Sequence, residues 1–132
     1  MKLNQITLPV HDMQAASEFY RKLGFLQIVD TPHYARFETP DQGPSFSLSL
    51  DTDMQPNGAG NGATLYFEHD DLDAWVKSLE AKGIVFETQP QDQRWLWREA
   101  SLYDPSGNKI KLYHAGENRL NPPWRVEISD EG

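Results

Sequence analysis

The amino-acid sequence predicts an α+β fold made of two copies of one βαβββ unit, and three observations support this prediction. A His-Asp pair precedes a helical pattern in each half of the chain, at His11-Asp12 and at His69-Asp70. Each helical pattern ends at a glycine, Gly24 or Gly83. Each half then closes with two strand-like segments joined by a turn rich in Pro, Asp and Gly. Such self-similarity within a chain is typical of a repeated structural unit.

In the first unit, apolar and polar residues alternate over residues 5–10, which predicts a strand. Asp12 is placed to cap the following helix, and Gly24 stands where a left-handed residue ends it. Residues 26–29 are of strand type, and a hairpin runs from 34–39 to 46–50. Its turn is Pro40-Asp41-Gln42-Gly43.

The second unit repeats this order. It has a strand at 64–68, a helix from its cap Asp70 to Gly83, and a strand at 84–87. A hairpin then runs from 95–103 to 109–113 through the turn Asp104-Pro105-Ser106-Gly107. The Gly/Asn-rich segment 54–62 is typical of a flexible connector, residues 121–124 of an extended element and residues 129–132 of a frayed end.

Length and composition favour a single globular domain over residues 1–132. We expect repeat one at 3–51, a linker at 52–62, repeat two at 63–114 and a tail at 115–132. The net charge of −8, without a basic stripe, argues against a nucleic-acid partner.

Three features of the sequence bear on where the protein is located in the cell. The chain has no apolar stretch long enough to span a membrane and no apolar run at its start that would direct secretion. It also contains no cysteine. We therefore expect a cytoplasmic protein without a membrane partner.

Two motifs carry a resemblance to a known family. Set in two βαβββ units, these motifs resemble the vicinal oxygen chelate superfamily. The first is Phe19-Tyr20-Arg21-Lys22-Leu23-Gly24-Phe25, and the second is Asp104-Pro105-Ser106-Gly107-Asn108-Lys109-Ile110. That superfamily includes glyoxalase I, extradiol dioxygenases, fosfomycin-resistance enzymes and bleomycin-binding proteins. The resemblance covers residues 3–114 and implies curved mixed sheets around a cavity, with helices on the outer faces. It also implies a homodimer whose sites are often completed by the partner chain.

Strand alternation predicts which side chains face the cavity, because successive residues point to opposite faces of a sheet. The apolar residues of each strand face the helices, and their neighbours face the cavity. The predicted cavity residues are Gln5, Thr7, Tyr34, Arg36, Glu38, Ser47, Ser49, Thr64, Tyr66, Trp95, Trp97, Glu99, Ser101, Tyr103, Lys111 and Tyr113.

The resemblance also implies four positions for metal ligands, and the residues found there do not suit a metal. The positions hold Gln5, Ser47 (or Ser49 after a shift of two residues), Thr64 and Lys111. Only Gln5 is a plausible ligand, because Ser and Thr are weak donors and an ammonium group repels a divalent cation. The four histidines lie elsewhere without metal-binding spacing. We expect no metal and no cofactor.

Other residues suit a small-molecule ligand. Trp95 and Trp97, two apart on a predicted strand, would share a face and stack on a planar or cationic ligand, or else fill the cavity or an interface. Arg36 and Lys111 would hold an anionic group, or else pair with Glu38 or Glu99.

Glu99, beside a lysine in an aromatic cavity, is also a weak candidate for a general base, with a structural ion pair as the alternative. The sequence thus predicts a metal-free protein that binds a planar or anionic small molecule. The alternatives are a glyoxalase-like lyase or isomerase, with or without a metal on displaced ligands, and a protein-interaction module. The predicted ligand-binding residues are Gln5, Tyr34, Arg36, Ser47, Thr64, Trp95, Trp97, Glu99 and Lys111.

Overall fold

The computed structural model describes residues 1–55 and 62–127. The elements in chain order are β1 (Gln5–Val10), α1 (Met13–Leu23), β2 (Leu26–Asp30), β3 (Tyr34–Glu38), β4 (Ser45–Leu50), β5 (Thr64–Glu68), α2 (Leu72–Ala81), β6 (Thr88–Asp92), β7 (Arg98–Tyr103), β8 (Lys109–His114) and the short 3₁₀ helix η1 (Gly116–Arg119). Most of the predicted connector (56–61) and the predicted frayed end (129–132) lie outside the described residues.

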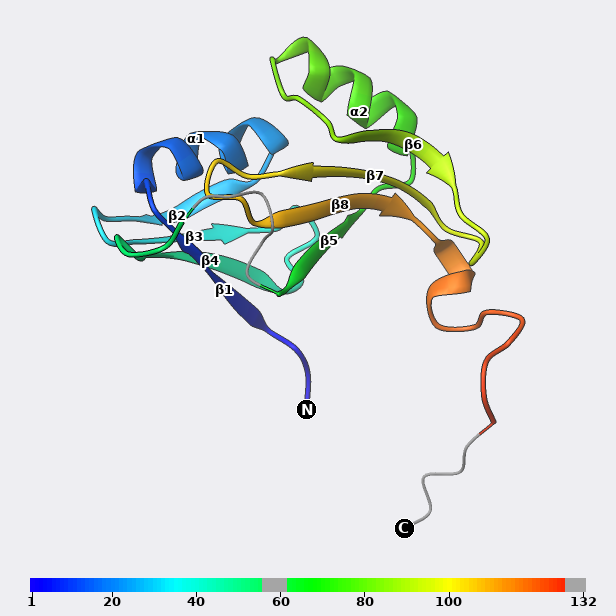
Figure 1. Ribbon diagram of the computed structural model, residues 1–132. Coiled ribbons are helices and arrows are strands. Elements are labelled where there is room, and N and C mark those ends of the chain that lie inside the picture. The colour runs from blue at the N-terminus through cyan, green and yellow to red at the C-terminus, as the bar shows by residue number, and fades with distance from the viewer. Residues whose placement is uncertain (56–61, 128–132) are drawn as a thin grey trace.

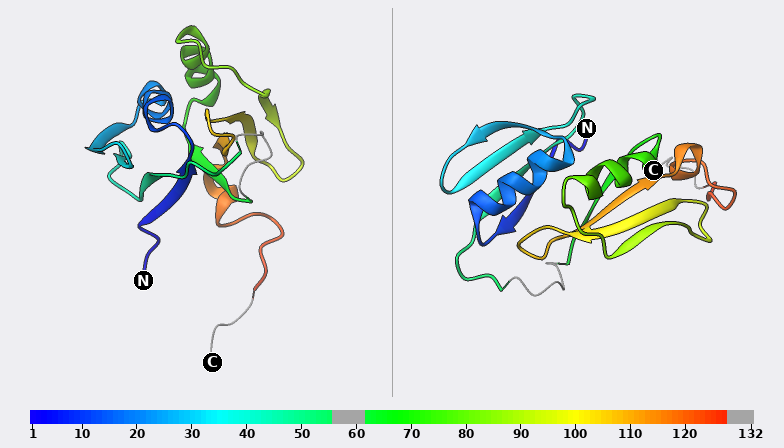
Figure 2. Two further views of the ribbon diagram at one scale, coloured as in Figure 1. Left: turned by 60° about the vertical axis from the view of Figure 1, so that its left-hand side comes forward. Right: turned by 90° about the horizontal axis from the view of Figure 1, so that it is seen from above.

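The eight strands form two mixed four-stranded sheets, which confirms the predicted fold class. Their strand orders are β1-β4-β3-β2 and β5-β8-β7-β6. In each sheet the first and last strand of the unit pair in parallel, and the other pairs are antiparallel. Helices α1 and α2 cover the same side of their sheets, so the opposite faces stay open (Figure 1). The view from above shows both helices in front of the strands (Figure 2).

The same register recurs in both sheets and defines equivalent positions. Ser47 on β4 is opposite Thr7 on β1, as Lys111 on β8 is opposite Tyr66 on β5. Ser47 and Lys111 are therefore equivalent, as the internal repeat predicts.

The third strand of each sheet extends this correspondence. Tyr34 on β3 is opposite Ser49, and Glu99 on β7 is opposite Tyr113. Ser49 lies two residues after Ser47 on β4, and Tyr113 lies two residues after Lys111 on β8. The phenol of Tyr34 and the carboxylate of Glu99 therefore occupy equivalent positions in the two units.

An aromatic core lies between the helices and the sheets. Tyr20 and Phe37 are completely buried, and Phe46 is 2% exposed. The ring centroid of Phe46 lies 5.1 Å from that of Phe25, which in turn lies 4.5 Å from that of Phe67 in the second unit. Aromatic contacts of this length pack both units into one core. No helix among the described residues is long and apolar enough to cross a membrane.

The two helices begin in slightly different ways. The Asp12 side chain accepts a hydrogen bond from the amide of Ala15 (3.1 Å), as expected. In α2 the cap is Asp71, not the predicted Asp70, and its carboxylate accepts from the amide of Ala74 (3.4 Å). The Asp71 amide donates to Nδ1 of His69 (2.9 Å), and this contact fixes the cap one residue later.

The turn that connects β7 and β8 ties the second unit to the first. The buried carboxylate of Asp104 accepts hydrogen bonds from the Tyr20 hydroxyl (2.6 Å) and from the amides of Ser106 and Asn108 (both 2.9 Å). The Asn108 side-chain amide donates to the same carboxylate (2.9 Å) and to the carbonyl of Pro9 (2.8 Å). The Asp-Pro-Ser-Gly-Asn motif therefore has a structural role at the junction of the units.

The strand predicted at residues 84–87 is wrong, because β6 covers Thr88–Asp92 instead. Ile84 is 7% exposed and Phe86 packs against the core, so the apolar pattern that predicted a strand reflects burial. The backbone joins the sheet only at Glu87, whose amide donates to the carbonyl of Ser101 (2.8 Å).

The segment that carries the two tryptophans is a turn and not a strand. The amide of Leu96 donates to the carbonyl of Gln93 (3.0 Å), and the amide of Gln93 donates to the carbonyl of Trp97 (2.7 Å). Leu96 has a left-handed backbone with φ of 68°. Trp95 and Trp97 therefore do not share a strand face, and β7 begins only at Arg98.

The segment after β8 also differs from the prediction. Residues 121–124 do not form an extended element, because the amide of Arg125 closes a turn on the carbonyl of Pro122 (3.0 Å). Trp124 is 55% exposed, so it makes little packing contact within the chain.

Candidate functional site

A polar cluster, here called the Tyr34 cluster, lies on the open face of the first sheet and consists of Gln5, Thr7, Tyr34, Arg36 and Ser47. The Arg36 guanidinium donates from Nε to the Tyr34 hydroxyl (3.0 Å). The Gln5 side-chain amide lies 3.5 Å from the same hydroxyl and 3.4 Å from the Ser47 hydroxyl. The hydroxyls of Ser47 and Thr7 are 2.7 Å apart. Strands β1, β3 and β4 thus bring these side chains together.

The Tyr34 oxygen is surrounded by donors. Its hydrogen bonds to Ser47 and, to a smaller extent, to Arg36 lower the pKa of the phenol. The Tyr34 hydroxyl thus accepts hydrogen bonds from Arg36 and Gln5 and remains a donor as well.

Arg36 is the available cation of this cluster. The structure gives it no carboxylate within 4.0 Å among the residues it describes, so the alternative of an ion pair with Glu38 or Glu99 is wrong for Arg36. Its guanidinium carbon lies 5.4 Å from the centroid of the Tyr34 ring. An arginine held in this way offers its remaining N–H groups to an anion.

A second cluster, the Glu99 cluster, lies on the open face of the other sheet around a buried carboxylate. Glu99 is 5% exposed. One of its oxygens lies 3.0 Å from Nζ of Lys111, and the other accepts a hydrogen bond from Nε1 of Trp95 (2.7 Å). Burial alone would lower the pKa of Lys111, but its contact with Glu99 reverses this effect and raises the pKa. Lys111 and Glu99 therefore form an ion pair, as the alternative to anion binding by Lys111 predicted.

Three aromatic rings complete the Glu99 cluster. The rings of Trp97 and Tyr113 are stacked, with centroids 4.8 Å apart and an interplanar angle of 29°. The Tyr66 ring meets both edge to face, at 6.0 Å from Trp97 and 5.4 Å from Tyr113. Trp97 donates its indole N–H to the carbonyl of Asn118 (3.2 Å), which fixes the ring. The rings form an apolar surface against which a planar ligand can stack.

A groove of about 880 Å³ separates the two edge strands β1 and β5. Gln5 of the Tyr34 cluster, Tyr66 of the Glu99 cluster and Thr64 of β5 all line it. Its other walls are mainly apolar and include Phe25, Phe67 and Trp75. A volume in this range is typical of small-molecule sites.

Most of the predicted ligand-binding residues therefore fall into the two clusters. Thr64 is the exception, since it lines the groove without a side-chain contact to either cluster among the described residues. Thr7, Tyr66 and Tyr113 were predicted only to face the cavity, and strand alternation was the signal that pointed to them. The structure adds a specific contact for each of them.

The residues do not fit a divalent metal at the four positions implied by the family. Within the described part of the chain, no group of three or more His, Cys, Asp or Glu side chains could hold a metal ion. The ammonium group of Lys111 stands at one of these positions, paired with Glu99, and would repel a cation there. No step of a reaction is therefore assigned to a metal.

Two mixed sheets from paired βαβββ units, with helices on one side and polar and aromatic clusters on the other, define the class of protein. The chain belongs to the Glyoxalase/Bleomycin resistance protein/Dioxygenase superfamily, whose family pattern matches residues 2–112. This result confirms the family resemblance of the sequence.

Two relatives in sequence come from Bacillus. The uncharacterized protein YraH of Bacillus subtilis is 30% identical over 126 residues, which cover 86% of this chain and 98% of YraH. A trivalent organoarsenical cleaving enzyme of Bacillus sp. is 26% identical over 137 residues, which cover 93% of this chain and 81% of the enzyme.

Solved structures share the fold. A glyoxalase/bleomycin resistance protein/dioxygenase from Nocardioides matches with a TM-score of 0.76 and 23% identity, covering 96% of this chain and 89% of the other. A bleomycin-binding protein complexed with bleomycin matches with a TM-score of 0.70 and 20% identity. The match covers 86% of this chain and 98% of the bleomycin-binding protein. At these identities the likeness shows the fold alone.

Proposed function

We propose that the protein binds a small planar molecule that carries an anionic group. The observation that carries this proposal is the pairing pattern of the two basic residues that were predicted to bind an anion. Arg36 has no carboxylate partner among the described residues, whereas Lys111 is neutralised by Glu99. The anionic group therefore contacts Arg36 and the neighbouring Tyr34 hydroxyl. One arginine contact to an anion is charge-assisted and geometrically specific.

The planar part of the ligand stacks on the aromatic rings of the Glu99 cluster. Trp97 is held by its bond to Asn118 and by Tyr113, so little side-chain entropy is lost when a ligand packs against it. The solved complex of a bleomycin-binding protein supports this proposal at the level of the fold.

We further propose a homodimer in which the first sheet of one copy faces the second sheet of its partner. Within one chain the two clusters lie on separate sheets, β1-β4-β3-β2 and β5-β8-β7-β6. A dimer would bring a free arginine and an aromatic surface to the same cavity, twice in each assembly. The family resemblance supports this arrangement.

The first experiment is a tryptophan-fluorescence titration with two matched probes, 2-naphthoate and its uncharged amide. We expect quenching by 2-naphthoate and weaker binding of the amide. Arg36→Gln should weaken 2-naphthoate binding at least about tenfold, the effect of losing about 1.4 kcal/mol. Arg94→Gln is the matched control, because Arg94 is an exposed arginine of the β6–β7 turn. Equal affinity of wild type and Arg36→Gln would refute the assignment of the anion site.

Mixing two variants that each bind weakly tests the shared cavity. If each cavity combines Arg36 of one copy with Trp97 of its partner, a heterodimer of Arg36→Gln and Trp97→Ala chains contains one intact cavity and one doubly altered cavity. Refolding the two variants together should then restore binding to about one quarter of all sites, because half of the random dimers are mixed. No recovery would place both residues in the same chain's site.

A lyase is the second candidate, because one relative is a trivalent organoarsenical cleaving enzyme at 26% identity. The weak candidate base Glu99 has both oxygens engaged, by Lys111 and by Trp95. We therefore expect no cleavage of a trivalent organoarsenical, with or without added Fe²⁺, Ni²⁺ or Zn²⁺. Turnover in this assay that Glu99→Gln abolishes would favour the enzyme.

A further inference from the structure

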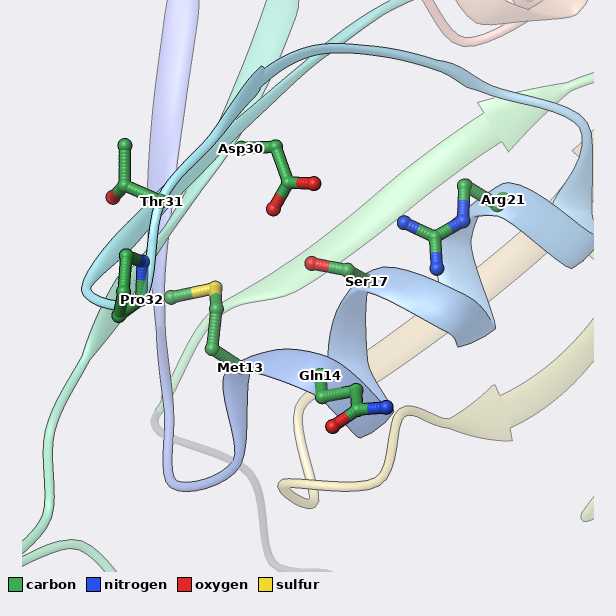
Figure 3. Close-up of a pocket in the computed structure, with 7 residues that line it drawn as sticks. All are labelled: Met13, Gln14, Ser17, Arg21, Asp30, Thr31 and Pro32. Atoms are coloured by element: carbon green, nitrogen blue, oxygen red, sulfur yellow. The ribbon is translucent and has the colours of Figure 1, made fainter.

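A second cavity lies away from both clusters, between helix α1 and the loop that follows β2. Its volume is about 530 Å³. Ser17, Gln14 and Arg21 of α1 form one wall, and Asp30 with the loop residues after it forms the other (Figure 3). Neither the Tyr34 cluster nor the Glu99 cluster contributes a residue to it.

Ser17 is the unusual residue of this cavity. It is 3% exposed, and its buried hydroxyl has no hydrogen-bond partner among the described residues. Leaving a buried hydroxyl without a partner is unfavourable, and most buried polar side chains are paired. Figure 3 shows this hydroxyl directed away from the helix and toward Asp30, across the cavity. The hydroxyl is therefore placed to bond a molecule that enters between the two walls.

Two opposite charges flank the Ser17 hydroxyl. The Arg21 guanidinium donates a hydrogen bond to the neutral side-chain oxygen of Gln27 and has no carboxylate within 4.0 Å among the described residues. Asp30 likewise has no cationic partner within this distance in the described part of the chain. In Figure 3 both side chains reach into the space in front of Ser17, from opposite walls.

We propose that this cavity binds a small zwitterion of amino-acid size, with its carboxylate on Arg21, its ammonium group on Asp30 and a hydrogen bond to Ser17. A guanidinium pairs well with a carboxylate, and an ammonium group with the Asp30 carboxylate. A simple anion would be repelled by Asp30, and a simple cation by Arg21. Only a ligand with both charges satisfies both walls at once.

A series of probes with increasing charge separation tests the proposal. Glycine, β-alanine and γ-aminobutyrate are titrated into the ¹⁵N-labelled protein, with acetate and methylammonium as singly charged controls. We expect one zwitterion to shift the amide signals of α1 and of Asp30 and Thr31, with an affinity at least about tenfold above that of either control. Zwitterions that bind no better than acetate would overturn the proposal.

Three variants of the cavity and two control variants test the assigned contacts. Arg21→Gln and Asp30→Asn should each weaken the best zwitterion about tenfold, whereas Lys22→Gln, an exposed change on the same helix turn, should not. Ser17→Ala should weaken binding and also raise the unfolding midpoint without ligand, because it removes an unpartnered hydroxyl and adds a better helix former. A lower midpoint would show that the hydroxyl is already satisfied. Arg36→Gln should leave zwitterion binding unchanged, which separates this site from the proposed anion site.

Discussion

Replacing Asp104 by alanine should destabilise the whole protein, although the residue lies in a turn. The side chain is 4% exposed and accepts four hydrogen bonds. One of them comes from the hydroxyl of Tyr20, which is itself completely buried and lies in the other unit. The substitution leaves that hydroxyl and the two turn amides without their acceptor.

The magnitude follows from these contacts. A hydrogen bond to a charged group contributes about 1.5–3 kcal/mol, but the four bonds are not additive. Removing the charge also relieves the cost of keeping a carboxylate out of water. We therefore expect a loss of about 3–5 kcal/mol in the free energy of unfolding, a large part of the roughly 5–15 kcal/mol typical of a domain.

Urea unfolding followed by circular dichroism measures this loss, and a thermal scan should show a decrease of about 10–15 °C in Tm. Asp41→Ala is the matched control, because Asp41 lies in the corresponding turn of the first unit. It is exposed and accepts from the amide of Gly43 (3.1 Å) and the hydroxyl of Thr39 (2.9 Å). We expect its free energy of unfolding to stay within about 1 kcal/mol of wild type. Equal losses in the two variants would refute the structural role assigned to Asp104.

Three further predictions concern titratable groups. Burial and the nearby Asp104 raise the pKa of Tyr20 in the folded state, so the unfolded chain loses this proton at lower pH than the folded protein. The free energy of unfolding should therefore fall as the pH rises above about 10, the usual pKa of tyrosine. Urea unfolding at pH 9–11 measures this fall, which should be smaller in Tyr20→Phe. The donors around Tyr34 lower its pKa, so the absorbance at 295 nm of the wild type should contain an early tyrosinate transition that Tyr34→Phe lacks. Lys111→Met should lower the free energy of unfolding by about 3 kcal/mol, because it leaves the Glu99 carboxylate buried without its ion-pair partner. In the same assay, the double variant Lys111→Met/Glu99→Gln should recover part of this loss.

Most of the element order along the chain, and the face on which the side chains of β1 and β4 lie, could be predicted from the sequence because both depend on local patterns. Alternation on β1 and β4 placed Gln5, Thr7 and Ser47 on one face, and the structure shows them in contact. The left-handed Gly24, with φ of 109°, was also predictable, because few other residues adopt that conformation at the end of a helix.

The errors arise where tertiary contacts override local preference. Strand β6 has the sequence Thr-Gln-Pro-Gln-Asp, in which only Thr88 favours a strand. It forms because β7 offers an edge for pairing. The turn at Leu96 has no glycine to mark it, so two tryptophans of strand type looked like a strand. The bond from Trp95 to Glu99 across this turn was not predictable from spacing alone.

The pairing of Lys111 with Glu99 illustrates a different limit. The sequence could show that two basic residues face the open side of the sheets, but both a free charge and an ion pair were compatible with it. Only the distances distinguish Lys111, 3.0 Å from a carboxylate, from Arg36. The choice between them determines which residue can hold an anion.

In a protein made of two similar units, each backbone position of one unit has an equivalent in the other. In this chain, equivalent positions carry different side chains with different contacts. Tyr34 and Glu99 occupy equivalent positions, yet one belongs to a polar group and the other to an ion pair beneath aromatic rings. Such a duplicated framework allows one half to acquire a new specificity while the other keeps the old one. It also offers a route for engineering, since a residue found in one half already fits the backbone geometry of its counterpart in the other half.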